Sequence, residues 1–394
     1  MTIDLDRARR ETPGTAKVTH LNNAGAALMP RPVIAALVDH IELEGRIGGY
    51  EAAEREAARV EHCYDALARL LNCARGEIAV VENATRAWDM AFYALPFRAG
   101  DRILTAAAEY ASNVISFLQV AKRTGAVVEV VPNDDSGQLS LAALERMIDA
   151  RVKLIAVTHV PTNGGLVNPA AGIGRLARAA GIPFLLDACQ SAGQMPLDVE
   201  ALGCDMLSAT GRKYLRGPRG IGFLYVRKGL LGRLEPPFLD LHAARWTGAR
   251  EFELRSDARR FENWETNVAA KLALGVAVDY ALGWGLEAVY ARVRALAEGL
   301  RVGLRRIPGA VVRDLGAERC GIVTFTLQGI DAGAVKAALA RRAINVTVST
   351  LSSTRYDMEA RGLEELVRAS VHYYNSEEEL ERFLAAVAEI AKGR

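Results

Sequence analysis

The 394-residue sequence is half apolar and carries 49 basic against 47 acidic residues, which gives a formal net charge of +2. A chain of this length can bury a large core and predicts two or more domains, and its scattered, balanced charges argue against a nucleic-acid partner. The N-terminal segment lacks the apolar stretch of a signal peptide and no segment approaches ~20 uninterrupted apolar residues, so we expect a cytoplasmic protein without a membrane span.

Cysteine and histidine usage argues against disulfide bonds and metal binding. The five cysteines are widely spaced without a C-x-x-C pair, and the six histidines show no metal-ligand spacing. We therefore expect reduced thiols and no metal site. Cys189 and Cys320 are interpreted as structural residues.

From about residue 78, short apolar runs alternate with segments of helical character. The predicted strands are 78–83, 101–107, 127–133, 153–160, 182–188, 206–210 and 220–226, and the predicted helices between them are 112–125, 139–150 and 168–181. This alternation predicts an α/β fold with a mainly parallel sheet of seven strands that helices cover on both faces.

After about residue 262 the pattern changes to that of a smaller α+β domain. Long helical segments at 268–285 and 287–306 precede predicted strands at 321–327, 344–349 and 366–374, with helices at 332–343 and 377–393. We predict an N-terminal segment 1–20 that packs with the small domain, a large domain 21–262, and a connecting helix with a small C-terminal domain 263–394.

Two residues in the large domain are candidates for covalent cofactor chemistry. Asp187 ends an apolar strand, and a carboxylate buried there needs a partner, although a helix cap or turn is the ordinary role of such a residue. Lys213 follows 26 residues later and could equally be a solvated surface lysine. Its neighbours Arg212, Arg216 and Arg219 would lower its pKa if they lay close, which favours imine formation.

Together, the lysine and the acid meet the needs of pyridoxal 5'-phosphate (PLP). The lysine forms the Schiff base, and the acid keeps the pyridine nitrogen protonated so that the ring withdraws electrons. Eight ordered segments also resemble the class V aminotransferase and cysteine desulfurase family of fold-type I PLP enzymes. They are LNNAGAALMP, ENATRAWDMA, AEYASN, HVPTNGGLVNP, DACQSAGQMPLDV, TGRKYLRGPRGIGFLYV, FENWETN and VRASVHYYNSEEELERF.

The resemblance implies a role for each matched residue. It implies Lys213 as the Schiff-base lysine, Asp187 at the pyridine nitrogen and Tyr110 stacked over the ring as a further catalytic candidate. It also implies that the cofactor contacts Ala84, Thr85 and Thr210 at its phosphate and Asn163 and Gln190 at its ring oxygen. For the substrate, it implies an Arg368 clamp on the carboxylate and Asn23 in a segment that borders the site.

The resemblance further implies a homodimer with composite active sites. Thr266 occupies the position of a threonine that binds the phosphate of the partner subunit. Five other residues are candidates to line the site, although a core or solvated role is their ordinary one: Trp88, His242, Trp246, Arg355 and Tyr356.

Departures from the family pattern shape the predicted reaction. Residues 344–366 contain no cysteine, whereas desulfurases carry a persulfide-forming cysteine there, and Arg212 stands where a histidine is common. These departures favour a carbon–sulfur (β-elimination) lyase or an epimerase that acts on an amino acid through an external aldimine and a quinonoid. A class V aminotransferase is the alternative. A persulfide-forming cysteine desulfurase or a non-catalytic binding subunit is less favoured.

Overall fold

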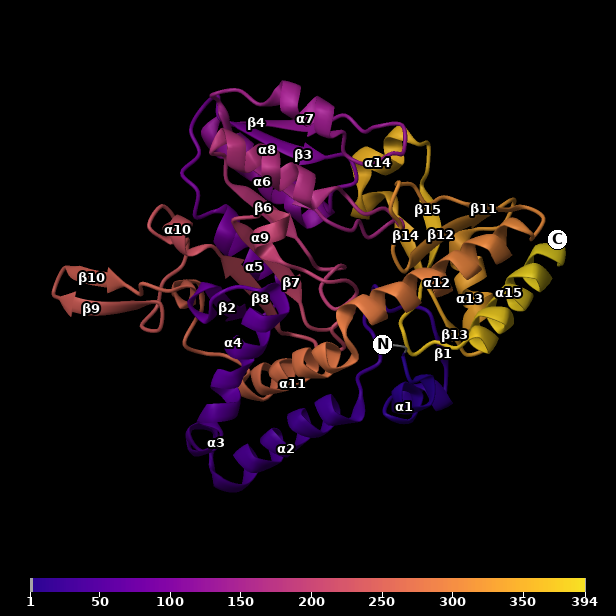
Figure 1. Ribbon diagram of the computed structural model, residues 1–394, viewed down its shortest axis with the longest axis horizontal. Helices are drawn as coiled ribbons and strands as arrows, with labels where there is room; N and C mark the ends of the chain where they lie inside the picture. The colour runs from indigo at the N-terminus through magenta and orange to yellow at the C-terminus, as the bar shows by residue number, and fades with distance from the viewer. Residues whose placement is uncertain (1–2, 394) are drawn as a thin grey trace.

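The computed structural model describes residues 3–393, which form a large sheet-based domain joined to a smaller domain (Figure 1). The large sheet has seven strands in the order β2-β8-β7-β6-β5-β3-β4. Their bounds are β2 Ile78–Val81, β3 Arg102–Ala106, β4 Val127–Val131, β5 Val152–Thr158, β6 Phe184–Asp187, β7 Met206–Thr210 and β8 Gly222–Val226. Only β8 runs against its neighbours, so the predicted mainly parallel sheet of seven strands is present.

Helices cover both faces of this sheet because successive strand residues point to opposite sides. Phe184 and Leu186 of β6 pack in one buried cluster, whereas Leu185 packs in another. The helices of this domain are α2 Arg31–Ile47, α3 Gly49–Arg55, α4 Ala57–Leu71, α5 Ala84–Phe92, α6 Ala111–Thr124, α7 Leu141–Met147, α8 Ala170–Ala180, α9 Val199–Leu202 and α10 Lys228–Leu231. Short 3-10 turns occur at Arg75–Glu77 and Ala258–Phe261.

A β-hairpin projects from the large domain at the left of Figure 1. Its strands are β9 Ala244–Gly248 and β10 Glu251–Leu254, which pair antiparallel. Trp246 and Phe252 on this hairpin are 80% and 57% exposed, which is unusual for large apolar side chains in a monomer.

The smaller domain is an antiparallel sheet with helices packed against it. The strand order is β11-β12-β15-β14, with bounds β11 Ala310–Val312, β12 Ile322–Leu327, β14 Thr347–Thr350 and β15 Glu365–Ser370. Its helices are α12 Leu286–Arg305, α13 Ala332–Ala340, α14 Arg355–Ala360 and α15 Glu377–Lys392, with a 3-10 turn at Leu351–Ser353.

The N-terminal segment contacts the smaller domain. Helix α1 Leu5–Arg10 places Ala8 in the apolar cluster of that domain, and a 3-10 turn follows at Pro13–Ala16. Strand β1 Thr19–His20 then pairs in parallel with β13 Ile344–Asn345.

Helix α11 Val268–Trp284 connects the two domains and meets α12 at a bend of 78°. Eleven of its residues are buried, which explains its strongly apolar sequence. No single helix within residues 3–393 is long and apolar enough to cross a membrane; α11 and α12 reach that length only as this bent pair.

One glycine lets α5 approach the sheet closely. A Cβ on Gly222 of β8 would lie 2.7 Å from the Ala209 carbonyl oxygen and 2.8 Å from the Asn83 carbonyl carbon. Main-chain atoms cannot move aside as a flexible side chain can. The glycine therefore sets the position of the N-terminus of α5 relative to β7 and β8.

We predict that Gly222→Ala lowers the free energy of unfolding by about 1–3 kcal/mol because of this overpacking. Urea denaturation of the apoprotein measures the loss. Gly229→Ala is the matched control, since nothing lies within 4 Å of the added methyl group there. Equal stability of the Gly222→Ala variant and the wild type would contradict the proposed close contact.

Candidate active site

The site lies at the carboxyl edge of the parallel strands, where loops leave the sheet. Thr158, Asp187 and Thr210 are the last residues of β5, β6 and β7. The register pairs Thr158 with Asp187, and Asp187 with Ser208 of β7. Residues that lie far apart in the chain are therefore neighbours at this edge.

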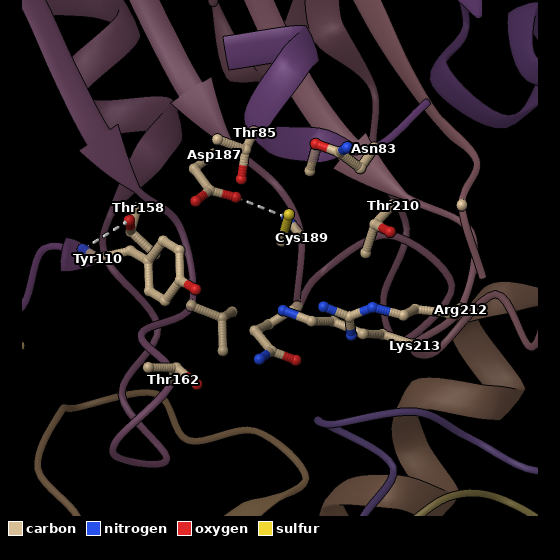
Figure 2. Close-up of a pocket in the computed structure, with 14 residues that line it drawn as sticks. Asn83, Thr85, Tyr110, Thr158, Thr162, Asp187, Cys189, Thr210, Arg212 and Lys213 are labelled. Atoms are coloured by element: carbon tan, nitrogen blue, oxygen red, sulfur yellow. Dashed lines mark hydrogen bonds between the residues drawn. The ribbon is translucent and has the colours of Figure 1, made fainter. Parts of the chain in front are cut away.

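A cavity of about 410 Å³ opens at this edge (Figure 2). Its lining includes an acid, a lysine, an aromatic ring and the start of a helix. The lining residues are Asn83, Ala84, Thr85, Tyr110, Thr158, Val160, Thr162, Asp187, Cys189, Gln190, Thr210, Arg212, Lys213 and Gly220.

The first turn of α5 provides an anion-binding end to the cavity. Asn83 caps the helix by accepting a hydrogen bond from the Arg86 amide at 2.9 Å, while Ala84 and Thr85 face the cavity. Free amide groups and the positive end of the helix dipole favour a phosphate here. Thr210 lines the same cavity from β7.

Asp187 is only 5% exposed and is held from both sides of its carboxylate. The Cys189 amide donates to Oδ1 at 2.8 Å, and Asn113 Nδ2 donates to Oδ2 at 3.1 Å. Both donors are neutral, so the carboxylate keeps its charge available for a cation in the cavity. A protonated pyridine nitrogen is such a cation.

Lys213 lies in the same cavity on the loop that follows β7, and Figure 2 shows it beside Arg212. Burial lowers the pKa of Lys213, and Arg212 and Arg368 lower it further, while Cys189 and Asp187 oppose this shift. A lysine with a lowered pKa supplies the neutral amine that imine formation needs.

Of the three expected arginine neighbours, Arg212 lowers the pKa of Lys213 and lines both cavities with it. Arg219 lines the adjoining cavity, which Lys213 also borders. Arg216 instead points away, where it donates to the Leu28 carbonyl at 2.8 Å and is 1% exposed.

The adjoining cavity, of about 400 Å³, shares Tyr110, Thr162, Arg212 and Lys213 with the first. Arg219 and Arg368 also line it, and none of the residues described as lining it is acidic. A cavity with several cations and no carboxylate favours an anionic ligand.

Arg368 lines the adjoining cavity and is held by neutral groups. Its side chain donates to the Thr162 carbonyl at 3.0 Å and to Asn22 Oδ1 at 3.5 Å. Its buried Nε has no partner among the described residues, and burial lowers its pKa to about 10, which leaves it charged at neutral pH.

The structure brings most of the predicted site residues together but places three of them elsewhere. Asn163 does not line the cavity described above; its amide donates to Asp357 of α14 at 2.9 Å. Asn23 is fully buried and donates to the Ser370 carbonyl at 2.7 Å. Thr266 lines a separate cavity with Tyr50 and Trp264.

The five further candidates also lie away from Lys213. Trp88 is buried in the core, and Trp246 is on the exposed hairpin. His242 shares the cavity of Thr266, while Arg355 and Tyr356 line an apolar pocket with α6.

Sequence reasoning missed several residues of the site. Asn22, rather than Asn23, lines the cavity with Arg368. Two further residues lie in the AEYASN motif. Asn113 donates a hydrogen bond to Asp187 and another to Glu109, so Glu109 reaches Asp187 through Asn113. Their spacing of four residues at the start of a predicted helix was a usable signal, because such residues share a helix face.

The family model for Aminotransferase class-V matches residues 19–383. The chain belongs to this family. A probable cysteine desulfurase of Pyrococcus abyssi is 30% identical over 392 residues, covering 98% of this chain and 97% of the relative. An apo cysteine desulfurase of Thermococcus onnurineus NA1 has a TM-score of 0.92 at 28% identity, covering 100% of this chain and 99% of the solved one.

These comparisons also bear on the fold and the cofactor. The class V chain has the fold of type I PLP enzymes. A solved C-DES mutant with glycine covalently linked to its PLP cofactor aligns with a TM-score of 0.87 at 24% identity, covering 97% of this chain and 99% of that one. The buried Gln190 Oε1 without a partner among the described residues, the lysine, the acid and the helix end fit that group. Pyridoxal 5'-phosphate is the cofactor of this class V enzyme.

One prediction from the sequence was wrong. A β-elimination lyase or an epimerase was favoured over a cysteine desulfurase, yet the relatives that match the chain over nearly its whole length are described as cysteine desulfurases. The error came from giving one absent cysteine too much weight. The shared cofactor residues cannot distinguish reaction branches, which depend on groups placed around the substrate.

Glu109 is a buried acid, and all of its described hydrogen bonds come from neutral donors. Its pKa leads to a testable prediction. Burial raises its pKa to about 7 from 4.5, while hydrogen bonds from Thr158 and Asn113 oppose that shift. A raised carboxyl pKa means that the folded state holds its proton longer, so stability falls as the pH rises from 4.5 to 7.

We predict that Glu109→Gln removes this loss. The difference in free energy of unfolding between the variant and the wild type should favour the variant by about 3 kcal/mol more at pH 8 than at pH 4.5. Urea denaturation of both proteins across this range provides the measurement. Parallel stability–pH curves for the two proteins would show that Glu109 has an ordinary pKa.

Proposed function

We propose that this class V enzyme is a cysteine desulfurase, which removes the sulfur atom of L-cysteine and leaves alanine. Lys213 lines both the cavity that contains Asp187 and the adjoining cavity that contains Arg368, which supports PLP chemistry on an amino acid with a free carboxylate. Full-length similarity to proteins described as cysteine desulfurases supports this substrate.

Three residues are proposed to act on the cofactor ring. PLP, when bound, withdraws electrons from the α-carbon of the substrate. Lys213 attaches the cofactor and, once free, carries the α-proton on Nζ, since its pKa is lowered. Asp187 keeps the ring nitrogen protonated. Tyr110, 37% exposed at the start of α6, stacks on the ring face.

Other residues are proposed to hold the two anionic ends of the complex. Ala84, Thr85 and Thr210 bind the cofactor phosphate at the N-terminus of α5. Gln190 contacts the ring oxygen from the buried end of the cavity. Arg368 lines the adjoining cavity and binds the substrate carboxylate through its guanidinium N–H groups.

The thiol that accepts sulfur is not in the segment that carries it in the desulfurase pattern. Residues 344–366 contain no cysteine, and Cys189 is the one cysteine among the described lining residues of the cavity. Burial raises the pKa of the Cys189 thiol, with Asp187 raising it further. A thiol that accepts sulfur therefore belongs either to a cysteine of this chain outside residues 344–366 or to another molecule.

A homodimer with composite sites is proposed on the face that carries Thr266. Exposed apolar side chains surround that cavity: Tyr50 is 77% exposed and Trp264 is 52% exposed. The hairpin with Trp246 adds a further large apolar group. Burial of such a surface against a second copy would stabilise the dimer and bring Thr266 to the partner's phosphate site.

The reaction is tested by incubating PLP-loaded protein with L-cysteine and dithiothreitol. We expect alanine and sulfide in equal amounts, and a loss of roughly 10³-fold or more in rate for Lys213→Ala, because the α-proton then has no acceptor. Amino-acid analysis and a sulfide assay measure the products. Pyruvate and ammonia in place of alanine would overturn the proposed function.

The composite site is tested by mixing two defective chains. We expect Thr266→Val to weaken PLP binding, and a mixture of Lys213→Ala and Thr266→Val chains to regain wild-type PLP affinity at one site per heterodimer. Only that site combines an intact Lys213 with an intact Thr266. A monomer in light scattering that binds PLP as tightly as the wild type would contradict the composite site.

A further inference from the structure

A second carboxylate lies close to Asp187 and is not among the residues assigned a role so far. Glu109 is 1% exposed and sits between β3 and α6. Asn113, 3% exposed and one helical turn further on, lies between the two acids. Its Nδ2 donates to Glu109 Oε1 at 2.8 Å and to Asp187 Oδ2 at 3.1 Å.

The Asn113 Nδ2 group donates to both carboxylates and also lies 3.5 Å from Thr158 Oγ1. These contacts hold the side chain in one orientation, and Asp187 Oδ2 is held with it. Because Asp187 Oδ1 is held by the Cys189 amide at 2.8 Å, the whole carboxylate is restrained. A restrained acid loses little entropy when it binds a cation.

Glu109 is itself held by several donors. The Thr158 amide donates to Oε2 at 2.8 Å, the Tyr110 amide to Oε1 at 3.0 Å and Thr105 Oγ1 to Oε2 at 3.2 Å. Thr158 Oγ1 also donates to Oε1. Thr158 is the residue opposite Asp187 in the sheet, so Glu109 connects β3, β5 and α6 at this edge.

No cationic group among the described residues donates a hydrogen bond to either acid. Every hydrogen bond that Glu109 and Asp187 accept from the described residues comes from a neutral donor. Two buried acids that share one amide repel each other when both are ionised. A positive charge in the cavity next to Asp187 would relieve that repulsion, and a protonated ring nitrogen is placed to supply it.

We propose that Glu109 and Asn113 are positioning residues that act through Asp187 on the cofactor ring nitrogen. Asn113 fixes the direction of the Asp187 carboxylate. Glu109 fixes Asn113 and adds negative potential at the same point. The inference rests on the proposed role of Asp187 but is independent of the substrate and of the sulfur chemistry.

The experiment compares two cofactors that differ in one atom: PLP and its analogue in which C–H replaces the ring nitrogen. The dissociation constant of each is measured by titrating apoprotein. Wild-type protein should bind PLP more tightly than the analogue, since only PLP offers a ring N–H to Asp187. Asp187→Asn should bring the ratio of the two constants close to one.

Glu109→Gln and Asn113→Ala should each reduce this ratio by roughly 3- to 10-fold, by weakening PLP binding while leaving analogue binding nearly unchanged. A charge-assisted hydrogen bond is worth enough for such a change. Gln119→Ala on the same helix is the control, because Gln119 accepts a hydrogen bond from the Tyr93 hydroxyl and contacts neither acid in its described hydrogen bonds. The ratio of the two dissociation constants in this variant should equal that of the wild type.

Equal weakening of both cofactors in Glu109→Gln and Asn113→Ala would overturn the inference and leave these residues a purely structural role. An unchanged ratio in these variants would also overturn it. If Asp187→Asn leaves the ratio at the wild-type value, both the inference and the proposed role of Asp187 fail. Absence of alanine from L-cysteine, with the ratios as expected, would reject only the proposed desulfurase activity.

Discussion

The site depends on one costly feature, which is a buried carboxylate at the end of the central strand β6. An acid that is 5% exposed needs compensation, and Asp187 receives neutral hydrogen bonds on both oxygens. Those bonds orient the charge without cancelling it. The carboxylate therefore remains available for a cationic ring, and the lysine, the helix end of α5 and the arginine-lined cavity are arranged around that ring position.

A second constraint holds the lysine loop in place. Arg216, three residues after Lys213, has a left-handed φ of 60° and lies 4.5 Å from the Tyr374 ring centroid. It donates to the Tyr373 hydroxyl at 2.6 Å and to the Leu28 carbonyl at 2.8 Å. A buried cation among aromatic rings thus joins the lysine loop to Leu28 and to the small domain.

The residues that bind the cofactor do not by themselves determine the type of reaction. The residues proposed to hold PLP are spread along the sheet edge, and their presence is compatible with several outcomes at the α-carbon. Arg212 and the cysteine-free segment 344–366 are departures within that framework. They did not identify the reaction, because a single replaced residue says little about the geometry around the substrate.

The sequence by itself determined the alternating α/β order and the seven strands of the large sheet, and it predicted Lys213 and Asp187 as the central pair. Apolar runs of strand length and a polar residue at their ends are local signals, so one chain is enough to read them. Tertiary structure decided the rest. Asn22 rather than Asn23 borders the cavity, Asn163 turns toward Asp357, and Glu109 reaches Asp187 through Asn113. These are choices between neighbouring side-chain directions and between segments far apart in the chain, and only packing resolves them.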